Sequence, residues 1–380
     1  MHANAFIPCP DPSLFAVILA GGHGERFWPL SRKARPKHHL ALFSPRSLLE
    51  STLDRLQGLV PPERTLVLTG ADQAEAVRSL VGELPAENVI VEPERRDTAA
   101  AMALAAGIIA RVAQDPAQAT ALVLPSDHHI PEAEPFRRTL QNAARVARQA
   151  QSIVTLAIPP TWPCPAFGYL ELGAPVQPPL PPLPSAFPSE LPPAFSVFPV
   201  QRFHEKPTPE VAQEYLDRGH FRWNAGMFVW TLPTILRALE STAPQLARFA
   251  ENLRTAPQVA PFLAEHFGSV PKISFDYAVM EKLPDTLAVE ADFPWDDLGG
   301  WTAAGKYLPE DPQGNASNVS LQTCDAHGNI VFSTNPSQHV ALLGVEDLIV
   351  VNTGDALLVC PKNQSERLRE IVGALPPALR

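Results

Sequence analysis

Short apolar runs alternate with stretches of helical periodicity along the first half of the chain, and this alternation limits the fold more than any other feature. The runs contain no regular polar residues, so both faces of the strands that they form should be buried. Strands of this kind, separated by helices, are typical of a mostly parallel sheet with helices on both faces. The runs are residues 15–20, 64–70, 88–93, 121–127 and 152–158, and the helical stretches are residues 47–57, 71–80, 98–112 and 135–150. The sequence therefore predicts an α/β fold with a Rossmann-like, mostly parallel mixed sheet.

The expected sheet also predicts where a ligand binds. In open α/β sheets, ligands bind beyond the carboxyl ends of the strands. The conspicuous polar residues stand at these ends: glycines and cations follow residues 15–20, and carboxylates end the runs 88–93 and 121–127. We therefore expect the functional site at this edge of the sheet.

Proline is unusually frequent, with 43 residues, many of them between Ala174 and Pro199. A packed helix or central strand cannot hold that density, so we interpret the stretch as an extended surface insertion within the first domain. After it we expect strands over residues 200–207 and 223–230, a helix from about Thr208 and another helix over residues 274–283.

The character of the sequence changes toward its C-terminus. From Asn318 to Cys360, short β-rich pieces are separated by Gly, Asn and Asp turns, and a final helix is expected from Gln364 to Val372. A chain of 380 residues suits two or three domains. We place a first domain at residues 1–290 and a β-rich, solenoid-like domain with the final helix at residues 291–380.

The chain is acidic overall, with a formal net charge of −10. This balance argues against a nucleic acid or a membrane surface as partner. No stretch approaches the ~18 apolar residues of a membrane span, and the N-terminus lacks the basic region of a secretory signal. We expect a cytoplasmic protein. A local cluster of cations opposes this acidic background and consists of Arg26, Arg32, Lys33, Arg35 and Lys37.

These cations follow a glycine turn in the stretch "LAGGHGERFWPLSRKARPKHH", which spans residues 19–39. Glycines at Gly21, Gly22 and Gly24 leave backbone N–H groups open to a close ligand. The stretch matches neither the GxxxxGK[ST] template of a P-loop nor the GxGxxG template of a dinucleotide fold. Arg26 and Lys37 suit a polyphosphate, because their charges would hold it and stabilise a departing pyrophosphate.

The same stretch resembles the LAGGxGxRLWPLSRxxxPK signature of the sugar nucleotidyltransferases, in the form found in mannose-1-phosphate guanylyltransferases. The resemblance implies that the loop binds the nucleotide through Leu19, Ala20, Gly21, Gly22 and Gly24. It gives Arg26 and Lys37 catalytic roles on the phosphates. The sequence departs from the signature at His23, Glu25 and Phe27, and at His38 and His39, where Gln-Phe is usual.

A carboxylate ends the third apolar run. Glu92 could accept hydrogen bonds from guanine N1–H and N2–H₂ together, a donor pair that adenine and the pyrimidines lack. The stretch "VEPERRDTAAAMALAAG" resembles the family segment EPxxRNTAxA. The resemblance implies nucleotide contacts by Asp97 and Thr98, with Asp97 standing where Asn is usual.

A second carboxylate follows the fourth run, in "LVLPSDHHI". Asp127 suits Mg²⁺, which prefers one or two carboxylates together with phosphate oxygens. Zinc is the alternative for an Asp-His-His cluster, but no further ligand lies at the usual spacing. The string "FPWDDLGGW" resembles the family's WxDxGxW, which implies Asp297 as the second metal ligand, and Ser126 belongs with the nucleotide-binding residues.

Further strings of this family imply a sugar-binding group. "FHEKP" resembles FxEKP, with Glu205 accepting from sugar hydroxyls and Lys206 pairing with the sugar phosphate in catalysis. "NAGMF" supplies Asn224, and Gly168 of "FGY" would let the sugar lie against the backbone. Asp276 either contacts the sugar or caps its helix.

The resemblance spans Phe15 to Arg380, and the proline-rich insertion is its largest departure. It implies the nucleotide-diphospho-sugar transferase fold and a left-handed β-helix-like C-terminal cap. It implies transfer of GMP from GTP to α-D-mannose 1-phosphate with Mg²⁺ as cofactor, giving GDP-mannose and pyrophosphate by in-line attack.

Two alternative functions stay open: a related enzyme with another NTP or sugar, and a non-catalytic sugar-nucleotide sensor. Glu92 argues against the first, and the joint presence of five charged site residues argues against the second. A homodimer and a monomer also both stay open.

Overall fold

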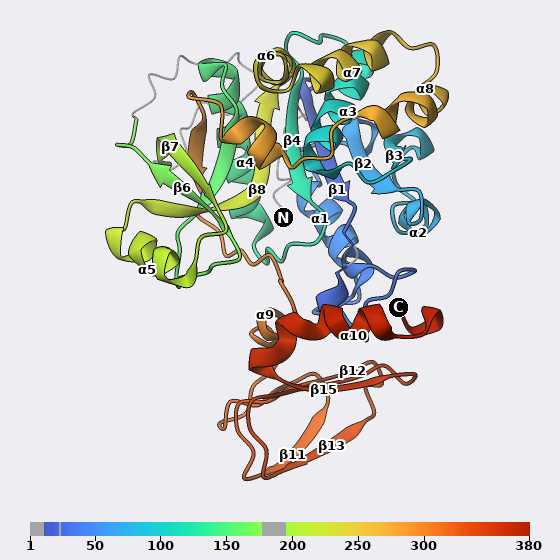
Figure 1. Cartoon of the computed structure of the whole chain (residues 1–380), viewed down its shortest axis with the longest axis vertical. Helices are drawn as coiled ribbons and strands as arrows, with labels where there is room; N and C mark the ends of the chain where they lie inside the picture. Colours follow the sequence, from blue (N-terminus) through green and yellow to red (C-terminus); the bar gives the residue numbers. More distant parts are fainter. Residues whose placement is uncertain (1–10, 23, 177–194) are drawn as a thin grey trace, which may run out of the picture.

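The computed structural model describes residues 11–22, 24–176 and 195–380. His23 and most of the predicted proline-rich loop lie outside these residues. Within the described residues, nine strands form one mixed sheet in the order β3-β2-β1-β4-β8-β5-β9-β7-β6. Figure 1 shows this sheet and its helices above a separate layer of β-strands near the C-terminus.

The four strands β3, β2, β1 and β4 are parallel neighbours. All five apolar runs form strands, as predicted. The strands are β1 (Leu14–Ala20), β2 (Thr65–Gly70), β3 (Val89–Glu92), β4 (Thr120–Pro125) and β5 (Val154–Ile158). The carboxyl ends of the four parallel strands meet at one edge of the sheet, which brings the predicted polar residues together.

The other half of the sheet is mainly antiparallel. There β8 (Phe221–Thr231) runs antiparallel to β4, β5 and β6 (Gly168–Leu172). β7 (Val197–Glu205) runs antiparallel to β6 and β9 (Leu287–Glu290), and β9 is parallel to β5.

The predicted loop is wrong at its C-terminal end, because Val197, Phe198 and Pro199 belong to β7. A proline lacks the N–H group that a strand residue donates to its neighbour. Pro199 pairs with Leu287 on β9, and the pairing of β7 with β6 ends one residue later, at Val200, beside a register shift. Pro199 is tolerated because it lies just outside the regular pairing with β6.

Helices cover both faces of the sheet, because alternate strand residues enter two different cores. Leu14, Ala16 and Ile18 pack in the core beneath α1 (Leu48–Leu56), α2 (Ala74–Leu80) and α4 (Ala133–Ala150). Phe15 and Val17 pack in the opposite core. That core is covered by α3 (Asp97–Val112), α6 (Leu232–Thr242), α7 (Pro244–Thr255) and α8 (Val259–His266).

Local sequence accounts for several helix boundaries. Ser47 and Glu50 form a reciprocal capping box at the start of α1, and Thr208 caps α5 (Pro209–Arg218). The predicted helix over residues 274–283 is instead a short π-helical turn, Asp276–Met280. The predicted final helix is also different: a 3-10 segment spans Lys362–Arg367, and α10 (Leu368–Ala374) follows and continues through Gly373.

The C-terminal strands form a β-helix-like layer. β10 (Ala316–Ser317), β12 (Ile330–Ser333) and β14 (Leu348–Asn352) are parallel neighbours, and β11 (Ser320–Cys324) pairs in parallel with β13 (His339–Leu343). β15 (Leu357–Pro361) closes the first sheet antiparallel to β14.

A third core joins this layer to the stretch after β1. Phe27 and Trp28 pack there with Trp301 of α9 (Trp301–Gly305), and Leu368 and Val372 of α10 belong to the same cluster. The Trp301 indole donates to the Trp28 carbonyl at 2.9 Å. In Figure 1, α10 lies between the blue stretch after β1 and strands β12 and β15. The C-terminal domain therefore packs directly beneath the glycine turn. Among the described residues, no helix combines the length and the apolar character needed to cross a membrane.

Candidate active site

The glycine turn follows β1 at the carboxyl edge of the sheet. Gly24 has a left-handed backbone with φ 68°, and a Cβ atom there would stand 2.3 Å from Lys37 Cβ, so only glycine lets the two segments meet. Among the described residues, nothing lies within 4 Å of a Cβ placed on Gly21 or Gly22. Both are exposed, so the backbone of the turn is open to a ligand.

Leu19, Ala20 and Ser126 form the base of this turn. The Leu19 carbonyl accepts a hydrogen bond from Ser126 N at 3.2 Å, which ties the end of β1 to the end of β4. The side chain of Ala20 is buried in the core, and Ser126 is 2 % exposed. These residues tie the loop to the sheet, and their contact with the nucleotide stays a prediction.

Lys37 and Asp127 meet at the centre of the edge. Lys37 Nζ lies 2.9 Å from Asp127 Oδ2 and also donates to the Asp297 carbonyl. Burial opposes ionisation of Asp127, but the charges of Lys37 and His128 outweigh it and hold the pKa of Asp127 below its ordinary value. The structure thus brings together a lysine and two aspartates from distant parts of the chain, as predicted.

The surroundings of Asp297 favour its ionised form less than those of Asp127 do. Burial raises the pKa of its carboxyl to about 6; Lys37 lowers it, while the neighbouring carboxylates of Asp296 and Asp127 raise it further. The Asp127 carboxylate thus adds to the cost of ionising Asp297, and a cation bound between them would offset that cost. Because Mg²⁺ is commonly held by one or two carboxylates plus phosphate oxygens, Asp127 and Asp297 fit that ion. No group of three or more His, Cys, Asp or Glu side chains that could hold a metal ion occurs among the described residues, so phosphate oxygens would have to complete the ligand set of Asp127 and Asp297.

Arg26 lines the same cavity as these carboxylates, and its charge lowers the pKa of Asp297. Its Nε is 2.9 Å from Glu366 Oε2 of the C-terminal domain, and its Nη1 donates weakly to the Gly299 carbonyl at 3.5 Å. The open cavity beside it has a volume of about 470 Å³. Its lining includes the predicted residues Gly24, Arg26, Lys37, Asp127 and Asp297, together with His128 and Arg369. The predicted phosphate-binding and metal-binding groups therefore share one cavity.

Glu92 stands at the carboxyl end of β3, two strands away from β1. At ~4.8 Å between neighbouring strands, this spacing places it roughly 10 Å along the edge from the glycine turn, a separation that suits a nucleotide base when the loop holds its phosphates. Burial raises the pKa of Glu92 to about 7, and the nearby Arg95 charge lowers it only in part. A ligand that donates hydrogen bonds to this half-buried carboxylate would stabilise its ionised form.

Asp97 and Thr98 lie at the start of α3, next to the segment of residues 273–276. The Thr98 hydroxyl accepts from Phe275 N at 2.8 Å, and Ala99 N donates to the Ile273 carbonyl. Asp97 is exposed, has a left-handed backbone with φ 66°, and accepts from Thr98 N at 2.8 Å. The start of α3 therefore holds the segment that carries Asp276, a structural contact that the sequence did not indicate.

The predicted sugar-binding residues Asn224 and Asp276 form a hydrogen-bonded pair. Asn224 Nδ2 donates to Asp276 Oδ1 at 3.1 Å, and Thr155 Oγ1 lies 2.8 Å from Asn224 Oδ1. No side-chain hydrogen bond from Asp276 caps its helical turn, so the capping alternative is wrong. Burial, reinforced by the Glu205 charge, raises the pKa of Asp276 to about 6.

Glu205 and Lys206 complete this group at the end of β7, where Lys206 Nζ pairs with the Glu205 carboxylate. Gly168 faces them from β6. A Cβ on Gly168 would stand 2.8 Å from Glu205 Oε2 and 2.8 Å from the Phe203 ring, so this glycine makes room for Glu205. The expectation that Gly168 lets the sugar lie against the backbone stays a prediction.

The antiparallel register places the two groups at the same edge. Val123 pairs with Phe228, and a Cβ on Gly226 would lie 4.0 Å from Pro125 Cγ. If this antiparallel register is continued beyond the ends of the ladder, Asn224 of β8 stands opposite Asp127 after β4. Sequence reasoning missed Arg369, which lines the cavity, and Glu366, which pairs with Arg26, because neither belongs to a motif and packing of the C-terminal domain brings both to the site.

Comparisons with known proteins give consistent results. A family model described as nucleotidyl transferase matches residues 15–311, and a model described as a MannoseP isomerase/GMP-like beta-helix domain matches residues 319–375. A protein of Sinorhizobium fredii named mannose-1-phosphate guanylyltransferase is 33% identical over 375 residues, which cover 96% of this chain and 68% of that protein. One of the same name from Klebsiella pneumoniae is 33% identical over 366 residues, covering 94% of this chain and 73% of that protein.

A solved structure is also similar over nearly the whole chain. It is a protein of Thermus thermophilus described as mannose-1-phosphate geranyltransferase, with a TM-score of 0.79 and 34% sequence identity. The match covers 95% of this chain and 99% of the Thermus chain. The β-helix-like layer and the sheet domain therefore recur together in a known protein.

Proposed function

The chain belongs to the nucleotidyl transferase family, and from that premise we propose that it transfers GMP from GTP to α-D-mannose 1-phosphate, giving GDP-mannose and pyrophosphate. The names of the two relatives that share a third of its residues support both the sugar and the nucleotide. The single observation that carries the proposal is the cavity at the carboxyl edge, where Arg26, Lys37, Asp127 and Asp297 converge beside an open glycine turn.

The chemistry needs no general base. The attacking group is an oxygen of the sugar phosphate, which is largely ionised near neutral pH because its second pKa is about 6 by analogy with phosphorylated side chains. That oxygen forms a bond to the α-phosphorus in line with the bond that breaks, and the electron pair of the broken bond leaves on pyrophosphate. Catalysis then depends on positioning and on charge stabilisation.

The residues of the chain divide these tasks. Arg26 holds the departing pyrophosphate, because its guanidinium borders the cavity and its present partner Glu366 is mostly exposed. Lys37 stays at the centre, within 2.9 Å of Asp127, where negative charge from both substrates meets. Lys206, at the end of β7, reduces the repulsion between the sugar phosphate and the triphosphate.

Asp127 and Asp297 would hold Mg²⁺. When bound, the ion neutralises charge on the α-phosphate and the sugar phosphate. Glu92 reads the guanine edge from the end of β3, and Asn224, Asp276 and Glu205 bind the sugar hydroxyls.

The first test is pyrophosphate release from each of the four NTPs with mannose 1-phosphate, with and without Mg²⁺, followed by GTP with glucose 1-phosphate. We expect Mg²⁺-dependent release with GTP and mannose 1-phosphate alone. Release with another pair would overturn the substrate assignment, and no release together with tight GDP-mannose binding would indicate a sensor. A homodimer remains a prediction, which light scattering on the purified protein tests.

A further inference from the structure

The C-terminal domain contributes charged side chains to the proposed phosphate cavity. Glu366 pairs with Arg26 at 2.9 Å, and Arg369 of α10 lines the cavity that contains Lys37, Asp127 and Asp297. Both residues lie more than 300 positions from the glycine turn in the sequence. Their presence at the site is a consequence of packing, so their role has to be argued from the geometry.

We propose that the C-terminal domain completes the pyrophosphate-binding site: Arg369 is a further phosphate-binding cation, and Glu366 occupies Arg26 until pyrophosphate replaces it. This inference rests on the proposed function for the identity of the anion. It assigns the β-helix-like domain a direct part in substrate binding.

The position of Arg369 is well determined by its neighbours. Leu368 and Val372 on the same helix are buried in the core that also contains Phe27 and Trp28. Trp28 Nε1 donates to the Leu379 carbonyl at 2.8 Å, which adds a second tie between the two segments. Because α10 and the stretch after the glycine turn share one core, the backbone of Arg369 is held beside the segment that carries Arg26.

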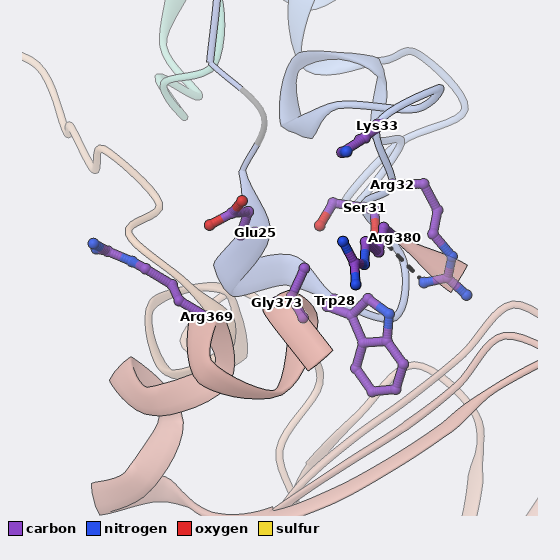
Figure 2. A pocket seen from close by; sticks show the side chains of 9 residues that line it. Glu25, Trp28, Ser31, Arg32, Lys33, Arg369, Gly373 and Arg380 are labelled. Atoms are coloured by element: carbon purple, nitrogen blue, oxygen red, sulfur yellow. Dashed lines mark hydrogen bonds between the residues drawn. The ribbon is translucent and has the colours of Figure 1, made fainter. Parts of the chain in front are cut away.

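Arg369 also borders a second, smaller pocket of about 180 Å³ between residues 25–33 and α10. Figure 2 shows its side chain extending from α10 on the side where Glu25 lies, away from Trp28, Arg32 and Arg380. Arg369 is the residue of α10 that borders both this pocket and the phosphate cavity. Arg369 therefore lies where the cavity and the smaller pocket adjoin, and we place the end of the bound polyphosphate beside it.

The charges in the cavity leave Arg369 available. Lys37 is engaged with Asp127, and Arg26 is engaged with Glu366. Among the residues that the structure describes, the Arg369 side chain is exposed and has no hydrogen-bond or ion-pair partner, whereas its neighbour Arg367 pairs with Glu370. Pyrophosphate carries several negative charges, and planar guanidinium groups bind phosphate oxygens with two parallel hydrogen bonds.

Glu366 is suited to exchange with a ligand. Its side chain is 69% exposed, and that of Arg26 is 30% exposed. Exposed ion pairs of this kind contribute little net stability, so a more highly charged phosphate can displace the carboxylate into solvent. The pair keeps Arg26 directed at the cavity when no phosphate is present.

The experiment compares three variants with the unaltered protein. Arg369→Gln removes the proposed contact, and Arg367→Gln is the matched control, because Arg367 pairs with Glu370 at 2.9 Å outside the cavity. Glu366→Gln removes the competing carboxylate. Isothermal titration calorimetry with pyrophosphate in the presence of Mg²⁺ measures the Kd, and thermal melting confirms that each variant is folded.

We expect Arg369→Gln to raise the Kd for pyrophosphate about tenfold, as for loss of one charge-assisted hydrogen bond. Glu366→Gln should lower the Kd by about twofold to fivefold, the range set by a weak surface ion pair. Arg367→Gln should leave it unchanged. An unaltered Kd in folded Arg369→Gln protein would overturn the inference, as would an equal loss in Arg367→Gln.

Steady-state kinetics separate this inference from the proposed function. If GTP and mannose 1-phosphate react, Arg369→Gln should raise the KM for GTP about tenfold while changing that for mannose 1-phosphate less than about twofold. If no nucleotide reacts but the Arg369-dependent binding of pyrophosphate persists, the proposed function fails and the C-terminal contact stands. Normal turnover with an unchanged KM for GTP would contradict the contact alone.

Discussion

The two ends of the candidate site are built by different means. At the phosphate end, full charges from Arg26, Lys37, Asp127 and Asp297 face an open cavity, and their partners can be exchanged for a ligand. At the sugar end, Asn224 and Asp276 are already joined by a hydrogen bond. In the proposed reaction, the first arrangement would stabilise charge that develops on the phosphates. The second provides a fixed pattern of donors and acceptors before the substrate arrives.

This comparison predicts that substitutions at the phosphate end reduce turnover most. Arg26→Ala should lower kcat by about 10²–10³, the effect of removing one donor that stabilises a developing anion. The melting temperature should change little, because Arg26 forms a partly exposed ion pair and one long hydrogen bond to the Gly299 carbonyl. The exposed Arg35→Ala in the same cation-rich stretch is the control. Near-normal turnover in Arg26→Ala would remove Arg26 from the mechanism.

The metal requirement tests the carboxylate pair. Asp297→Asn should raise the Mg²⁺ concentration for half-maximal activity by about 10–100-fold, because one of two anionic ligands is lost. Activity titrations with Mg²⁺ at saturating substrates measure this shift. An unchanged titration would show that Asp297 is not a ligand, even though it lies in the cavity beside Lys37.

At the sugar end the effect should appear in binding. Asn224→Ala removes the donor to Asp276 and leaves that half-buried carboxylate without its amide partner. An unpaired buried polar group costs about 1–3 kcal/mol, so we expect roughly a tenfold higher KM for mannose 1-phosphate and a lower melting temperature. Asn252→Ala on α7, at a distance from the site, serves as a control. A fall in kcat with an unchanged KM would place Asn224 at the phosphate end instead.

Much of this architecture follows from local sequence. The strands β1 to β5 were predictable because strands buried on both faces must be uninterrupted in apolar residues. The edge at which Glu92 and Asp127 stand was predictable for the same reason, since parallel strands align their carboxyl ends.

The rest depends on long-range packing. Pro199 enters a strand only because the ladder with β6 ends beside it, and Asp276 lies in a π-helical turn whose start is held by Thr98 from another helix. Arg369 reaches the cavity, and Glu366 reaches Arg26, through a core shared between the two domains. A sequence pattern carries no signal for such contacts, because each partner is defined only after the domains have packed.

The pH dependence of nucleotide binding distinguishes Glu92 from the other charged residues. Burial raises its pKa to about 7, so the carboxylate that accepts guanine donors is present above pH 7 and is lost as the pH falls. We expect the KM for GTP to rise about tenfold between about pH 7.5 and 6, because each pH unit below the pKa reduces the ionised fraction by at most about tenfold. Glu92→Gln should flatten this profile and reduce the preference for GTP over ATP. A profile that is identical in both proteins would show that another group reads the base.

The same raised pKa has a consequence for folding. The folded protein favours the protonated form of Glu92. Protonation of Glu92 therefore contributes most to the stability of the fold below the ordinary pKa of 4.5, and this contribution is lost as the pH rises through about 7. Glu92→Gln should therefore melt at a higher temperature than the unaltered protein at about pH 8, and the difference should shrink toward about pH 5.

The smallest expected effect concerns the space that a glycine leaves at the sugar end. A Cβ on Gly168 would stand 2.8 Å from Glu205 Oε2, but that carboxylate is the end of a flexible side chain and can move by a few tenths of an ångström. Gly168→Ala should therefore raise the KM for mannose 1-phosphate only about twofold to fivefold, as for a weakened but not lost hydrogen bond. The KM for GTP should not change. Gly173→Ala is a matched control, because its Cβ would meet Pro199 Cγ at 2.8 Å without touching Glu205. Equal effects of the two substitutions on the sugar KM would show that crowding of the sheet, and not the position of Glu205, determines sugar binding.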